Sequence, residues 1–60
     1  RYSEGSLEYT LLSELTRRAH SADSLARVTQ QPVAKILEVM SILEITGEVT
    51  PLGSGQWIAR

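Results

Sequence analysis

Pro32 separates two amphipathic segments, and this separation limits the possible folds more than any other feature of the sequence. Proline suits the first position of a helix because its missing amide would be unpaired there, and it disfavours helical backbone at the preceding residue. Apolar side chains recur at helical spacing over residues 22–29 and over residues 32–46, and Gly47 suits the position after the second segment. The sequence therefore predicts a helix of two turns, a tight turn at residues 30–31 and a longer helix.

A further helix is predicted over residues 7–18, before this pair. Its apolar face consists of four leucines: Leu7, Leu11, Leu12 and Leu15. Ser6 and Ser21 are the predicted N-caps of the first and second helices, because a serine hydroxyl can accept a hydrogen bond from a first-turn amide. Arg17 and Arg18 complement the negative end of the first helix dipole. The connector at residues 19–21 could add one short strand.

The C-terminal segment predicts a β-hairpin. Two short β-type runs, at residues 49–52 and 56–58, flank the glycine-rich turn at residues 53–55. Pro51 has no amide hydrogen to donate, so it is expected on an exposed edge of the sheet.

These elements predict an α+β domain, a small winged helix-turn-helix in which three helices are followed by a β-hairpin wing. Residues 1–5 are interpreted as a linker or frayed N-terminus, and residues 6–60 as the domain, expected to be the C-terminal part of a larger chain. The predicted core contains Leu11, Leu12, Leu15, Leu25, Val28, Ile36, Leu37, Met40, Leu43, Val49 and Trp57.

Composition excludes several classes of protein. Six basic and seven acidic residues give a net charge of −1, which excludes a polybasic nucleic-acid coat. The absence of cysteine excludes disulfides and thiolate metal sites. Because a chain without cysteine is compatible with a reducing compartment, we expect a cytoplasmic location. The longest apolar run, at residues 57–59, is far shorter than the roughly 20 residues of a membrane span.

Enzymatic chemistry is not expected. His20 has no second histidine or carboxylate at metal-ligand spacing, so no metal is predicted. The turn at residues 53–55 leads into a strand and not into a helix, unlike a phosphate-binding loop. We therefore predict no cofactor and no catalytic residue.

The run from Leu7 onward resembles the C-terminal winged-helix domain of the DNA-processing protein A (DprA) family. The resemblance rests on Asp23-x-Leu25-Ala26, on the helix start Pro32-Val33-x-x-Ile36-Leu37, on the helix end Leu43-Glu44-Ile45-Thr46-Gly47, and on Gly53 and Gly55 followed by Trp57. It implies a parent protein with a preceding Rossmann-like domain that binds single-stranded DNA and helps to load a RecA-type recombinase during natural transformation. It further implies that this domain is an accessory contact module for DNA or protein.

The residues predicted to contact DNA are Gln30, Gln31, Lys35 and Arg60. The first residues of a recognition helix meet base edges, where glutamine can pair with adenine and lysine with guanine or phosphate. Because Lys35 is the only basic residue of this helix, we expect weak binding to single- or double-stranded DNA. The alternative is that these are ordinary polar residues of a solvated helix start.

A protein-contact surface is the second hypothesis. Helical spacing predicts that Val33, Ile36, Leu37, Met40 and Leu43 face the core, and that Val39 and Ile42 form an outward apolar strip. Exposed strips of this kind often mark a partner surface, here a RecA-type recombinase or a neighbouring domain of the parent. The alternative is that the hairpin or another domain covers the strip.

Overall fold

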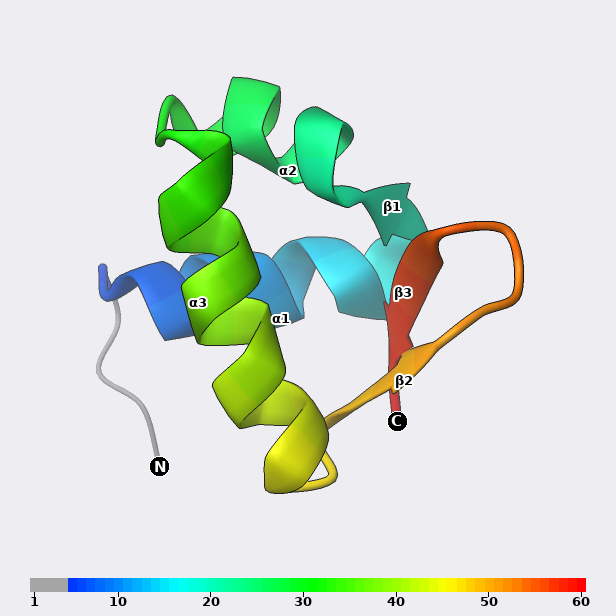
Figure 1. Cartoon of the computed structure of the whole chain (residues 1–60). Helices are drawn as coiled ribbons and strands as arrows, with labels where there is room; N and C mark the ends of the chain where they lie inside the picture. The colour runs from blue at the N-terminus through cyan, green and yellow to red at the C-terminus, as the bar shows by residue number, and fades with distance from the viewer. Residues whose placement is uncertain (1–4) are drawn as a thin grey trace.

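The computed structural model describes residues 5–60, which form three helices and a three-stranded antiparallel sheet (Figure 1). In chain order the elements are α1 (Leu7–Arg17), β1 (His20–Ser21), α2 (Ala22–Thr29), α3 (Val33–Ile45), β2 (Val49–Pro51) and β3 (Gln56–Ala59). The predicted α+β class is confirmed, and the element order is consistent with the predicted layout. The predicted linker lies, apart from Gly5, outside the described residues.

The helix ends follow the capping residues that the sequence marks. The Ser6 hydroxyl accepts a hydrogen bond from the Tyr9 amide at 3.1 Å, and the Ser21 hydroxyl accepts one from the Ser24 amide at 3.2 Å. Pro32 is the N-cap of α3. The helix therefore begins at Val33, one residue later than predicted. The predicted helix boundaries are therefore correct to within one residue.

The sheet has the strand order β1-β3-β2, with the last strand in the centre. In the register of the central strand, Trp57 lies opposite both His20 and Pro51, and Val49 lies opposite Ala59. The predicted hairpin and the predicted short strand are confirmed. Pro51 is exposed on the edge strand β2, as its missing amide requires.

The core lies between the three helices and one face of the sheet. Its fully buried side chains are Leu11, Leu15, Leu25, Ile36, Met40 and Leu43, joined by Val49 and Val39. Four predicted core residues differ: Val28 and Leu37 are exposed, and Leu12 and Trp57 are half-buried at the edge of the core.

The orientation of α3 accounts for the exposure of Leu37. The helix turns Val39 into the core and leaves Val33 and Leu37 exposed, so its buried stripe is rotated relative to the predicted one. Apolar residues occupy most of the circumference of α3, so helical spacing alone allows more than one buried face. Contact with the other elements selects the face.

None of the helices within residues 5–60 is both long and apolar enough to cross a membrane.

Candidate nucleic-acid and protein interfaces

The turn between α2 and α3 brings three of the four predicted DNA-contact residues together. Gln30 and Gln31 form the turn, and Lys35 lies in the first turn of α3; all three are exposed. We call this group the α2–α3 corner; it lies at the upper left of Figure 1. Its shape is fixed by backbone bonds: the Gln31 amide donates to the Ala26 carbonyl at 3.1 Å, and the Lys35 amide donates to the Pro32 carbonyl at 3.0 Å.

Gln30 has an unusual backbone conformation. Its φ of 59° and ψ of 39° place it in the left-handed region, and no other non-glycine residue among residues 5–60 has a positive φ. Glycine usually occupies this position after a helix because a Cβ atom is disfavoured there. A glutamine here therefore keeps an exposed amide at the corner at some expense of stability.

The charge of Lys35 is locally compensated. Its ammonium nitrogen lies 3.6 Å from a carboxylate oxygen of Glu38, one turn further along α3, and both side chains are more than half exposed. An exposed pair of this kind contributes little to stability. It does place a negative charge beside the lysine predicted to meet DNA.

Arg60 lies apart from the corner. Its backbone amide donates to the Glu48 carbonyl at 3.1 Å, so it lies near the opposite end of α3 (Figure 1). Because α3 has 13 residues and each residue rises about 1.5 Å, the two ends of the helix are well separated. The predicted DNA-contact set is therefore divided between two places.

The predicted strip of Val39 and Ile42 is wrong for Val39. Its side chain is 5% exposed and belongs to the core cluster, whereas Ile42 is exposed as predicted. Val39 turns inward with Ile36 and Leu43, the buried residues of α3 that lie three and four positions away on the same side of the helix.

A different apolar surface takes the place of this strip. Val33, Leu37, Ser41 and Ile45 follow one another at intervals of four residues along α3, and all four are exposed. Side chains at this spacing form one ridge on a helix surface, and we call this set the apolar ridge. Ile45 is 85% exposed, an unusually high value for an isoleucine in a helix. The sequence carries a signal for the ridge, since α3 is apolar on nearly every side.

The C-terminal end of α3 is tied to the sheet. The indole N–H of Trp57 on β3 donates a hydrogen bond to the carboxylate of Glu44. Trp57 is half-buried and packs against the core, so it braces the hairpin against α3. This bond directs the Glu44 side chain toward the hairpin.

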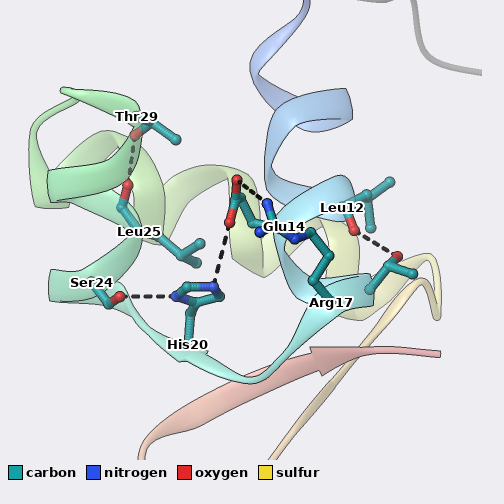
Figure 2. A network of polar contacts seen from close by, with 8 residues as sticks. Leu12, Glu14, Arg17, His20, Ser24, Leu25 and Thr29 are labelled. Atoms are coloured by element: carbon teal, nitrogen blue, oxygen red, sulfur yellow. Dashed lines mark hydrogen bonds and ion pairs between the residues drawn. The ribbon is translucent and has the colours of Figure 1, made fainter.

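A polar network joins α1, β1 and α2 (Figure 2). His20 is buried, and its Nδ1 lies 2.9 Å from the hydroxyl of Ser24. Its Nε2 lies 3.7 Å from a carboxylate oxygen of Glu14, whose other oxygen lies 3.5 Å from the Arg17 guanidinium. The network links three elements through their polar side chains.

Neither a metal site nor a pocket is found within residues 5–60. No three histidine or acidic side chains in that range are grouped as metal ligands would be, and no cavity opens there. The candidate sites of the described chain are therefore surfaces: the α2–α3 corner and the apolar ridge.

No protein-family model, curated protein or solved structure matches this chain.

Proposed function

We propose that this chain is a winged helix-turn-helix domain that serves as an accessory module of a DNA-processing protein and makes weak contacts with DNA. The α2–α3 corner is the observation that carries the proposal. In helix-turn-helix modules, the N-terminal residues of the second helix meet the base edges. Lys35 lies in the first turn of α3, Gln30 and Gln31 lie in the turn just before it, and all three are exposed.

The resemblance to the DNA-processing protein A family supports the same proposal. Three of its motif residues have clear local roles: Leu25 is fully buried, Pro32 caps α3, and Gly47 ends it with a φ of 80°. The parent protein is then one that handles single-stranded DNA and loads a RecA-type recombinase, as the resemblance implies. The domain contributes additional contacts to that activity.

The expected DNA affinity is low for electrostatic reasons. Phosphate neutralisation supplies most non-specific affinity, and Lys35 is paired with Glu38 in a chain of net charge −1. The tip of the hairpin, residues 52–55, contains no basic residue that could add a second phosphate contact. We expect a dissociation constant in the range typical of non-specific contact, about 10⁻⁴–10⁻⁶ M, and a shallow dependence on salt.

Fluorescence anisotropy with duplex and single-stranded DNA, from low to physiological salt, tests this proposal. Lys35→Glu should abolish the binding, whereas Arg18→Glu, the same charge change between α1 and β1, should weaken it only slightly. Glu38→Gln should strengthen binding because it removes the carboxylate beside Lys35. Equal losses in Lys35→Glu and Arg18→Glu would show that the corner is not the contact. Nanomolar, sequence-selective binding would instead indicate a specific regulator.

A second candidate function is protein contact, which the apolar ridge favours. Three large apolar side chains, Val33, Leu37 and Ile45, are exposed along one line of α3. In the helix-turn-helix interpretation this helix faces the groove of DNA, where polar and basic side chains would be expected. An apolar surface there suits a protein partner, such as a neighbouring domain or a RecA-type recombinase. Nuclear magnetic resonance titration with each partner should shift amides along the ridge, and shifts confined to the corner would argue against it.

A further inference from the structure

His20 lies where α1, β1 and α2 meet, and its ring stands between two groups that can accept hydrogen bonds (Figure 2). The side chain is only 9% exposed. Its Nδ1 lies 2.9 Å from the Ser24 hydroxyl, and its Nε2 lies 3.7 Å from a carboxylate oxygen of Glu14. The second distance is too long for a hydrogen bond, so Nε2 is buried without a hydrogen-bond partner among residues 5–60. A buried polar atom left unpaired lowers stability.

The protonation state of the ring decides how many hydrogen bonds it can donate. A neutral imidazole carries one N–H group, whereas an imidazolium carries two. The Glu14 carboxylate can only accept, and the Ser24 hydroxyl can accept as well as donate. The charged ring can therefore donate to both neighbours at once, and a bond from it to a carboxylate is roughly twice as strong as a neutral one. Protonation thus favours closure of the 3.7 Å gap to about 2.7–2.9 Å, the length of a charge-assisted bond.

The other charges on α1 and α2 do not cancel this attraction. The Arg17 guanidinium lies 3.5 Å from the other carboxylate oxygen of Glu14, and the Arg17 side chain is 71% exposed. Water and salt therefore screen its repulsion from a charged ring. Arg18 and Asp23, which are close to His20 in the chain, are both exposed.

The sheet and α3 add no further charge to the ring. In the sheet, His20 lies opposite the uncharged Trp57 of β3, and β2 contains no ionisable residue. The Glu44 carboxylate of α3 accepts a hydrogen bond from the Trp57 indole. Within residues 5–60, only Ser24 and Glu14 make a hydrogen bond or an ion pair with the His20 ring. Glu14 therefore supplies the charge that most affects the ring.

We propose that His20 and Glu14 form a pH-dependent ion pair. When the ring takes up a proton from solvent, Nε2 donates to the Glu14 carboxylate and fastens the last turn of α1 to β1 and to the start of α2. The pair stabilises the domain in mildly acidic solution, and this contribution is lost as the pH rises and the ring loses its proton. The proposal does not depend on the proposed function, because His20 precedes the start of α2 and the α2–α3 corner follows its end (Figure 1).

Urea unfolding at about pH 5.5 and about pH 8 tests the ion pair. Histidine ordinarily changes charge in this range, glutamate ordinarily stays ionised, and the chain has one histidine and no cysteine. Glu14→Gln keeps the shape of the side chain and removes its charge. We expect the loss in urea midpoint to be roughly twice as large at the lower pH as at the higher pH. The exposed contact with Arg17 contributes little at either pH.

An equal loss at both pH values, or a larger loss at the higher pH, would overturn the proposal. Glu8→Gln is the matched control, since it makes the same change in the first turn of the same helix, and its effect should not depend on pH. In a chain that also carries His20→Gln, the loss caused by Glu14→Gln should no longer depend on pH. A dependence that persisted there would assign it to another group and would also overturn the pair.

Nuclear magnetic resonance of the wild-type chain tests the pair without any substitution, and so decides the proposal even if His20→Gln fails to fold. As the His20 ring titrates, the side-chain carboxyl carbon of Glu14 should shift with the same midpoint, and that of Glu8 should not. A ring that stayed neutral at about pH 5.5 would overturn the proposal. A Glu14 carboxyl carbon that did not follow the ring would overturn it as well.

Discussion

α2 and α3 end in the same kind of backbone turn, but different residues occupy its left-handed position. After α3, Gly47 has a φ of 80°, and the next amide, Glu48 N–H, donates to the Leu43 carbonyl at 2.9 Å. After α2, Gln30 has a φ of 59°, and the Gln31 amide donates to the Ala26 carbonyl at 3.1 Å. The hydrogen bond spans five residues in both cases, so the backbone requirement is the same.

Gly47 and Gln30 differ in the free energy that their left-handed conformation costs, and only Gln30 exposes a polar side chain in return. A left-handed conformation costs an ordinary L-residue about 1–2 kcal/mol, and glycine avoids this cost. Nothing lies within 4 Å of the position where a Cβ of Gly47 would be, so its φ alone favours glycine there. Gln30 bears this conformational cost, and its side-chain amide is exposed at the α2–α3 corner. Residues held in sparsely populated conformations cluster at functional sites, which supports a binding role for the corner.

The two ends of α3 also differ in their side-chain support. At the C-terminal end, Trp57 packs on the core and donates to Glu44. At the N-terminal end, Pro32 caps the helix without any side-chain hydrogen bond. The end of α3 beside the sheet is therefore the more strongly held, and substitutions there should have the larger effects on stability.

Of the substitutions at Trp57, Gly47 and Gln30, Trp57→Ala should have the largest effect on stability. It removes a ring that packs against the core, together with the bond to Glu44. A fully buried tryptophan loses 3–5 kcal/mol on this change, so a half-buried one should lose about 2–3 kcal/mol. Urea unfolding followed by circular dichroism measures the difference.

Trp57→Phe separates the two contributions of this residue. It keeps most of the ring and removes the indole N–H, so it should lower the free energy of unfolding by only about 1 kcal/mol. A loss as large as that of Trp57→Ala would mean that the bond to Glu44, and not the packing, braces this end of α3.

Gly47→Ala should destabilise the domain by about 1–2 kcal/mol, because it places a Cβ on a left-handed residue. Gly53→Ala is the matched control: its φ is not positive and no atom lies within 4 Å of the new Cβ. It should leave the urea midpoint nearly unchanged or raise it slightly. Equal losses in the two variants would contradict the conformational explanation.

Local signals account for the parts of the fold that were predicted correctly. Ser6, Ser21 and Gly47 act through atoms a few residues away, so the helix ends can be predicted without the tertiary structure. The glycine-rich turn predicts the hairpin for the same reason.

The rotation of α3 depends on non-local contacts and was predicted wrongly. Val39 and Leu37 are both apolar and both lie at helical spacing from Met40 or Leu43, so periodicity cannot choose between them. α3 packs against α2 and β2, and in this position Val39 is buried and Leu37 is exposed. Because Val39 is buried, the apolar ridge replaces the predicted strip of Val39 and Ile42 as the exposed apolar surface of α3. The division of Arg60 from the corner likewise follows from the sheet register, which pairs the end of β3 with the start of β2.

The smallest expected effect is also the one that bears most directly on the comparison of the two turns. Gln30→Gly should stabilise the domain, because relief of the left-handed conformation, about 1–2 kcal/mol, exceeds the greater entropy of an unfolded glycine, about 0.5–1 kcal/mol. The net gain should be about 0.5–1 kcal/mol, seen as a higher urea midpoint with an unchanged slope. DNA affinity should fall several-fold at the same time, because the exposed amide is lost.

Gln31→Gly provides the matched control for this last prediction. It removes the same side chain one residue later, where φ is not positive, so no strain is relieved and stability should fall by the glycine entropy alone. If both variants lost stability, Gln30 would not be strained. Gln30 and Gly47 would then share the left-handed conformation without a conformational cost at Gln30. If Gln30→Gly gained stability and kept full DNA affinity, the strain at the corner would have no connection with binding. A gain in stability together with a loss of affinity is the result expected of a residue retained for the surface that it presents.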